Sequence, residues 1–285
     1  MGGGMAVNLA SGGHEVTGVD KDPAALERMQ AQGVGITDDA PAAVRAADVV
    51  FTSLTVRAYQ AVHRELLLPN ARAGQVFVDT STLPVPEARR TALSLRERGV
   101  ETLDAPVSGG AAAAGAGRLR IFVGGERAVF ERMLPLFALI GPREKTVYGG
   151  PCGGGQILKV IQQTCERMLD CMRMEVLSFG HHSGVDWPAI LAACGEDPAH
   201  PGPYGRLVEK IQAGDREYET VQSDLCCLNS EWPYYVEQCR EEGFSMPMLE
   251  AMWAIVQRME PVNKDGVHRP QASVWHALMS TKQPR

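Results

Sequence analysis

Lys159 and Gln163 are the residues of this chain whose types and spacing most directly suggest proton chemistry. On a helix they would lie on one face, one turn apart. A lysine ammonium can donate a proton to a carbonyl oxygen, and a lysine with a lowered pKa can accept one. The amide of Gln163 could hold the same oxygen. The spacing also fits a solvated lysine that hydrogen-bonds Gln163, with Glu166 on the same polar face, so spacing alone leaves both interpretations open.

Two loops that carry hydroxyls and glycines follow apolar runs of strand length. Residues 79–82 (Asp-Thr-Ser-Thr) form the first loop, and residues 104–110 (Asp-Ala-Pro-Val-Ser-Gly-Gly) form the second. Without a Cβ atom, Gly109 and Gly110 let their backbone amides approach a small anion closely, and the Ser108 hydroxyl adds a donor. Either loop alone is as readily an ordinary turn. Two of them in series favour a binding site for a small anion.

The chain begins with a run of glycines, Gly2 to Gly4, ahead of a helix-like segment at 6–10. Glycines at the start of a helix can place backbone amides against the pyrophosphate of a dinucleotide. Asp20 ends a strand-like run at the ~20-residue spacing at which an acidic residue takes the ribose hydroxyls. A flexible glycine leader is the alternative interpretation. The helix-like, turn-like and strand-like segments that follow have the order and spacing of a dinucleotide-binding unit, and they favour the dinucleotide turn.

The apolar strand that normally opens a dinucleotide-binding unit does not precede these glycines. Gly2 corresponds to the last glycine of the usual G-x-G-x-x-G turn. Such a first strand is central and buried on both faces, so its loss would leave neighbouring ladder groups unpaired. We therefore expect the upstream reading frame to encode an apolar strand that ends in Gly-x-Gly. Without it we expect poor folding or weak cofactor binding.

Strand-like and helix-like segments alternate up to about residue 150. This alternation predicts an α/β fold, a Rossmann-like domain with a mostly parallel sheet and helices on both faces. Ligands of such sheets bind at the carboxyl ends of the strands, where the two polar loops lie. The strand-like segments are 15–20, 48–54, 75–79, 99–104 and 119–123, and the helix-like segments are 6–10, 23–32, 56–68 and 86–98.

Strand signals nearly vanish after the glycine-rich stretch 149–155. Apolar residues then recur at three- and four-residue steps from Leu158 to Val176, which predicts a long helix. The chain is long enough for two cores. We predict a dinucleotide-binding domain at 1–150 and an all-helical domain at 151–285. The second domain would begin with the long helix, shape the substrate pocket and mediate oligomerisation.

Composition excludes several classes of protein. A formal charge of -6 argues against a nucleic-acid surface. No apolar run approaches the ~18 residues of a membrane span, and no secretory signal is visible. The seven cysteines form no Cys-x-x-Cys pair, which favours reduced thiols and a cytoplasmic location. The adjacent His181 and His182 lack metal-ligand spacing, so we expect no metal.

Four stretches resemble the β-hydroxyacid dehydrogenase family, the group that contains 3-hydroxyisobutyrate dehydrogenase. The resemblance covers residues 1 to about 185. It implies a Rossmann-like domain, a long interdomain helix, an all-helical domain, and a homodimer or homotetramer. The implied reaction is reversible oxidation of a short β-hydroxyacid, or reduction of the matching semialdehyde, by a nicotinamide cofactor. The stretches are Met1-Gly2 with Met5-Ala6-Val7-Asn8-Leu9, the loop 79–82, the loop 104–110, and Gly155 followed by Lys159.

The resemblance also implies a role for individual residues. Lys159 would be the general acid/base, with Gln163 holding the substrate oxygen. Asp20 favours NAD because a carboxylate repels the 2′-phosphate of NADP, although the adjacent Lys21 keeps NADP open. The cofactor would lie against Gly2, Gly3, Asp20, Leu54, Thr55, Thr82 and Asp224, and the substrate carboxylate against Ser108, Gly109 and Gly110.

Several positions depart from the family pattern. Gln162 and Gln163 replace two asparagines, Thr55 replaces a proline, and Ser223 replaces a lysine that faces the cofactor. Two alternatives to a hydroxyacid dehydrogenase therefore stay open. One is a catalytically weakened NAD(P)-binding relative that acts as a sensor or partner. The other is an imine or carbonyl reductase on the same scaffold, against which Lys159 argues. The sequence does not name the substrate.

Overall fold

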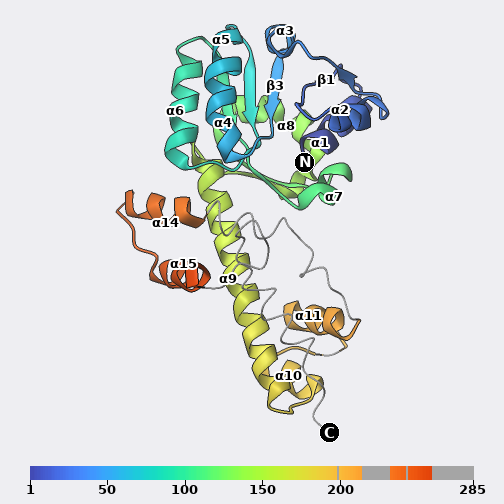
Figure 1. The fold of residues 1–285 in the computed structure, drawn as a ribbon, viewed down its shortest axis with the longest axis vertical. Coiled ribbons are helices and arrows are strands. Elements are labelled where there is room, and N and C mark those ends of the chain that lie inside the picture. Colours follow the sequence, from blue (N-terminus) through green and yellow to red (C-terminus); the bar gives the residue numbers. More distant parts are fainter. Residues whose placement is uncertain (198, 214–231, 242, 259–285) are drawn as a thin grey trace. The chain divides into compact units, whose positions relative to one another are not determined.

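Two compact units, Met1–Ile161 and Gln162–Arg285, make up the chain. The boundary between them lies inside one long helix rather than in a loop, so the predicted boundary near residue 150 stays a prediction. The computed structural model describes residues 1–197, 199–213, 232–241 and 243–258 (Figure 1).

A six-stranded sheet forms the centre of the first unit, with the strand order β3-β4-β5-β7-β6 and β8 paired to β7. Its first three strands are parallel, and β7 runs antiparallel to β5 and β6. The carboxyl ends of β3, β4 and β5 therefore meet at one edge of the sheet. The strands are β3 (Val49–Thr52), β4 (Val76–Asp79), β5 (Glu101–Asp104), β6 (Val107–Ser108), β7 (Arg120–Gly125) and β8 (Thr146–Tyr148).

Helices cover both faces of this sheet (Figure 1). Because side chains alternate along a strand, Val76 and Val78 of β4 pack with α1 and α8, whereas Phe77 packs with α3 and α6. This arrangement is the predicted α/β fold. The helices are α1 (Gly2–Ser11), α2 (Pro23–Gln30), α3 (Ala40–Ala46), α4 (Val56–Val62), α5 (Leu68–Asn70), α6 (Val85–Arg96), α7 (Gly110–Gly115) and α8 (Arg127–Ile140), with a π-helical turn at His63–Leu67 between α4 and α5.

A separate two-stranded parallel sheet holds β1 (Thr17–Gly18) and β2 (Gly35–Ile36). The predicted strand 15–20 is thus present but short. Among the described strands, β3 pairs only with β4. Its residues Val49–Phe51 are half-buried, whereas the matching residues of β4 are buried. The open edge of β3 therefore carries apolar side chains of the kind found in central strands.

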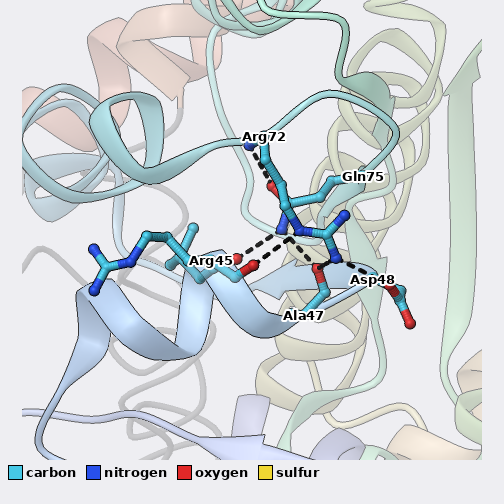
Figure 2. Close-up of polar contacts among 6 residues, drawn as sticks. Arg45, Ala47, Asp48, Arg72 and Gln75 are labelled. Atoms are coloured by element: carbon cyan, nitrogen blue, oxygen red, sulfur yellow. Dashed lines mark hydrogen bonds and ion pairs between the residues drawn. The ribbon is translucent and has the colours of Figure 1, made fainter.

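The amino end of β4 is braced by a buried glutamine (Figure 2). The Gln75 amide nitrogen donates to the backbone oxygens of Val44 and Ala47, at 2.7 and 2.6 Å. Its oxygen accepts the Arg72 backbone N–H at 2.7 Å, and the Arg72 guanidinium reaches Asp48 at 3.0 Å. The two bonds from the Gln75 amide nitrogen satisfy backbone oxygens that α3 leaves open at its carboxyl end.

The described elements of the second unit are helices. Met174 and Leu177 of α9 pack against Ile190, Leu191 and Leu207. None of the helices in the described ranges is long and apolar enough to span a membrane. The helices are α9 (Gly154–His182), which begins in the first unit, α10 (Trp187–Ala193), α11 (Pro203–Gln212), α14 (Trp232–Glu241) and α15 (Pro247–Arg258).

Candidate active site

Asp104, the last residue of β5, holds the first turn of α9. Its Oδ1 accepts the Gly153 backbone N–H at 2.8 Å, and its Oδ2 accepts the Gln156 backbone N–H at 3.0 Å. An acidic side chain at this end of a helix satisfies open donors and complements the helix dipole. Burial raises the pKa of the Asp104 carboxyl, although the two backbone donors oppose the rise. The start of α9 is thereby fixed to the carboxyl edge of the sheet.

Gly155 allows α9 to approach the sheet closely. A Cβ atom at this position would lie 2.5 Å from the backbone oxygens of Asp104 and Phe122. Any side chain there would push the helix away from β5 and β7. This glycine precedes Lys159 by about one helical turn, so the close packing also sets the position of the lysine.

Lys159 is buried, with 4% of its surface exposed. Its Nζ donates to the backbone oxygen of Val107 at 2.9 Å. Val107 directly precedes Ser108, so the amine lies at the start of the serine-diglycine loop. The interpretation of a solvated lysine is wrong, because the side chain is buried against β6. Glu166 instead accepts a hydrogen bond from Gln162.

The serine-diglycine loop is the turn from β6 into α7. Gly109 has a φ of +136° and Gly110 has a φ of +73°, values that favour glycine. A Cβ atom on Gly109 would lie 2.7 Å from the Cβ of Ala113. Both glycines are exposed and Ser108 is half-buried. The backbone of this loop is therefore open to a ligand beside the Lys159 amine.

The loops that follow β3 and β4 are tied together. Asp79 Oδ1 accepts the Thr52 hydroxyl at 2.8 Å and the Ser81 backbone N–H at 3.0 Å. The Ser81 hydroxyl oxygen in turn accepts the Leu54 backbone N–H at 2.9 Å. Leu54 and Thr82 are therefore held on neighbouring loops at the carboxyl edge of the sheet, both half-buried.

A small cavity lies next to Asp79 and is also lined by Thr52, Tyr59 and Thr91. Burial raises the pKa of Asp79 to about 6, against the hydrogen bonds from Ser81 and Thr52. Burial and the charge of Asp79 raise the pKa of Tyr59. The Tyr59 hydroxyl faces both the Asp79 carboxyl and the Thr91 hydroxyl, and its hydrogen bond to Asp79 opposes the rise in the pKa of that carboxyl.

The glycines at the start of α1 lie beside the β3 loop. A Cβ atom on Gly2 would lie 3.2 Å from the Cβ of Ser53, the residue before Leu54. Gly4 is needed for packing, because its Cβ would lie 2.8 Å from the Gly115 backbone nitrogen of α7. The first turn of α1 therefore faces the same edge of the sheet as the other loops.

The remaining predicted site residues are more scattered. Gly3 lies in the first turn of α1, and Thr55 is exposed at the start of α4. Asp20 is exposed after β1, and its Oδ1 accepts the Asp22 backbone N–H at 2.9 Å. In the second unit, Gln163 is buried and accepts the Tyr235 hydroxyl. Asp224, with the neighbouring Ser223, lies outside the described residues.

Residues 1–150 match the family model of the NAD binding domain of 6-phosphogluconate dehydrogenase. The chain belongs to this family. Its first unit is therefore an NAD(P)-binding domain, and the loops described above lie where such a domain binds its dinucleotide, at the carboxyl ends of parallel strands.

Proteins whose sequences resemble this chain include a dehydrogenase and a reductase. The NAD-dependent L-serine dehydrogenase of Pseudomonas aeruginosa is 33% identical over 189 residues, which are 65% of this chain and 63% of the relative. The 2-hydroxy-3-oxopropionate reductase of Escherichia coli is 36% identical over 189 residues, 65% of this chain and 64% of the relative. Both matches thus span less than two thirds of the relative's length.

A solved structure resembles almost the whole chain. The 3-hydroxyisobutyrate dehydrogenase of Mycobacterium tuberculosis with L-serine has a TM-score of 0.80 and 26% sequence identity. The likeness covers 98% of this chain and 96% of that one. This NAD(P)-binding chain therefore shares the two-domain fold of 3-hydroxyisobutyrate dehydrogenases.

Sequence reasoning missed the supporting residues of the site. Asp79 and Asp104 were recognised only as ends of strands, and Tyr59 and Gln156 were not singled out. One signal was available for Gln156, because it precedes Lys159 by three positions and shares its helix face. The partners of these residues come from distant parts of the chain, which a motif search does not connect.

Proposed function

We propose that the protein is an NAD(P)-dependent β-hydroxyacid dehydrogenase. It would transfer a hydride between the nicotinamide cofactor and a short β-hydroxyacid, or reduce the matching semialdehyde. The observation that supports this proposal most strongly is the position of Lys159. Its buried amine donates to the carbonyl of Val107, immediately before Ser108 and the two glycines.

In the proposed mechanism the loop of Ser108, Gly109 and Gly110 holds the substrate carboxylate with backbone amides and a hydroxyl. Lys159 then donates a proton to the carbonyl oxygen during reduction and accepts the hydroxyl proton during oxidation. When bound, the nicotinamide would supply or take up the hydride. Gln163 stands one turn further along α9, and we assign it the role of holding the reacting oxygen.

The cofactor would bind along the carboxyl edge of the first unit. Gly2 and Gly3 would offer the amides of the first turn of α1 to the pyrophosphate. Leu54, Thr55 and Thr82 would line the nicotinamide end. NAD is the proposed cofactor because the exposed carboxylate of Asp20 would repel a 2′-phosphate, and Asp224 is proposed as a further contact. The proposal places the protein in the cytoplasm.

The substrate would be an acid of three or four carbons with a β-hydroxyl. The names of the relatives support this class, since they act on L-serine, 3-hydroxyisobutyrate or 2-hydroxy-3-oxopropionate. The proposed carboxylate loop begins beside the Lys159 amine, which supports an acid whose hydroxyl carbon is close to its carboxylate.

The experiment that tests this function is a screen of nicotinamide absorbance. It covers 3-hydroxyisobutyrate, glycerate, 3-hydroxypropionate, L-serine, threonate and their semialdehydes, each with NAD and NADP. We expect turnover with at least one member, and Lys159→Ala should lower kcat by about 10²–10⁴-fold while NADH still binds.

Near-normal turnover by Lys159→Ala would refute the mechanism. NADH binding without turnover of any acid would instead favour the sensor or partner role, and turnover of a cyclic imine would favour the imine reductase.

We further propose that the chain forms a homodimer or homotetramer. Four apolar residues of α9 in the second unit lie at three- and four-residue steps and are exposed: Leu169, Met172, Val176 and Phe179. A contiguous exposed apolar stripe is typical of a protein–protein interface.

A further inference from the structure

Gln156 in the first turn of α9 is among the most buried polar residues of the protein, with 1% of its surface exposed. Its amide oxygen accepts the Leu83 backbone N–H at 3.0 Å. Its amide nitrogen donates to the Ser81 backbone oxygen at 2.9 Å. These two backbone groups flank a single residue, Thr82. The side chain therefore binds the loop after β4 much as the backbone of a neighbouring strand would.

The backbone of Gln156 is fixed from a second direction. Its N–H donates to Asp104 Oδ2 at 3.0 Å, which ties the same residue to the end of β5. Lys159 follows three positions later on the same face of the helix, and its amine is anchored at Val107. One residue thus connects the end of β5, the loop that carries Thr82 and the helical turn that carries the lysine.

We propose that Gln156 is a positioning residue for the nicotinamide end of the cofactor, because it sets the Thr82 loop at a fixed position relative to Lys159. The inference rests on the proposed placement of the nicotinamide beside Thr82. Gln156 itself touches neither cofactor nor substrate in this scheme. It acts through the two backbone bonds on either side of Thr82.

The chemistry of the amide explains why glutamine fits this place. One end must accept and the other must donate, and only Asn and Gln carry both groups in one planar amide. Asparagine is one methylene shorter and would not reach both backbone groups from the same helix. Methionine matches glutamine in length and volume but makes neither bond. It would leave the Leu83 N–H and the Ser81 carbonyl buried without a partner.

The chain offers a matched control in Gln75, the buried glutamine at the opposite end of β4 (Figure 2). Its amide also bonds backbone groups at both ends, on Arg72, Val44 and Ala47. It lies at the amino end of the strand, whereas the cofactor loops follow the carboxyl ends. Gln75→Met therefore removes the same type of brace with a similar cost to folding, but away from the proposed site.

The test compares wild type, Gln156→Met and Gln75→Met in the full chain. The measurements are the thermal midpoint, the NADH dissociation constant from cofactor fluorescence, and hydrogen exchange of the peptide that contains Leu83. We expect both variants to lower the midpoint. Only Gln156→Met should raise the NADH dissociation constant, by about ten-fold for two lost neutral hydrogen bonds, and speed exchange at Leu83.

Two outcomes would overturn the inference. They are an NADH dissociation constant of Gln156→Met that is no higher than that of Gln75→Met, and unchanged exchange at Leu83 in Gln156→Met. If Gln156→Met does not fold, hydrogen exchange of the Leu83 amide in wild type provides the test. The bond to Gln156 should protect this amide from exchange, so rapid exchange in wild type would also overturn the inference. Failure of the proposed function is seen separately, as absent turnover of every hydroxyacid by a wild type that binds NADH.

Discussion

The Asp79 carboxyl lies in a half-buried position at the end of β4, and its ionisation has a consequence for stability. Burial raises its pKa to about 6, from 3.8 in an unfolded chain. Between these two pH values the folded protein binds a proton that the unfolded chain has released. The contribution of Asp79 to the free energy of unfolding therefore falls as the pH rises from about 4 to about 6, and stays low above pH 6.

Asp79→Asn should accordingly raise the free energy of unfolding at pH 8. The upper limit is about 3 kcal/mol, reduced by the weaker hydrogen bonds from Thr52 and Ser81 to a neutral acceptor. The measurement is urea unfolding of both proteins at pH 5 and pH 8. The difference between them should be larger at pH 8. Because Asp104 also has a raised pKa, only the difference between the proteins isolates Asp79. A variant less stable than wild type at both pH values would contradict the prediction.

The ionised Asp79 carboxylate lowers the free energy of unfolding above pH 6, but it also holds the loops that we propose bind the cofactor. The charge of Asp79 strengthens the bonds that hold Thr52 and Ser81, and Ser81 in turn holds Leu54. Residue types at the ends of strands could be recognised from the sequence. Their partners could not, because hydrogen bonds between side chain and distant backbone leave no pattern along the chain.

At the scale of the elements, α9 packs closely against the sheet, and Gly155 permits that contact. Gly155→Ala would place a Cβ atom 2.5 Å from two backbone oxygens. We expect it to lower the free energy of unfolding by about 1–3 kcal/mol, the usual cost of overpacking, and to lower kcat because Lys159 moves with the helix.

Gly115 in α7 provides the control for this substitution. It also lies in a helix, and a Cβ atom there meets nothing within 4 Å. Gly115→Ala should therefore leave the free energy of unfolding unchanged or raise it by up to about 1 kcal/mol. Urea unfolding of the two variants measures both effects. Equal stabilities would mean that α9 can shift at no cost.

The elements differ in how far the sequence predicts them. The strands β3, β4 and β5 were predicted because short apolar runs end in polar residues. Helix α3 was missed because it has only seven residues and only Val44 among them is buried. A single buried residue shows no helical periodicity in the sequence. Helix α8 carries an internal proline, Pro135, which weakens a helical interpretation. Packing by Phe130 and Phe137 stabilises the helix nonetheless.

At the scale of the whole molecule, the order of elements is easier to predict than their contacts. The change from alternating segments to helices predicted the two kinds of architecture. The hydrogen bonds from Gln156 to Ser81 and Leu83 join residues 75 and 73 positions apart, and no local pattern indicates them. The predicted long helix is α9, but its apolar residues Met172 and Val176 are exposed rather than buried. Helical periodicity identifies an apolar face without identifying what covers it.

In the proposed oligomer, a second copy of the chain would cover the exposed apolar face of α9. Burial of exposed side chains such as Phe179, 75% exposed, stabilises an interface by about 25 cal/mol per Å² of apolar surface. We expect light scattering at micromolar concentration to give wild type a multiple of the 30.8 kDa chain mass. The double variant Met172→Glu/Phe179→Glu should give a smaller mass, because it places charges in the interface. Leu93→Glu, which alters an apolar residue 60% exposed on α6, should leave the mass unchanged. A monomeric wild type, or a double variant of unchanged mass, would show that another partner or segment covers α9.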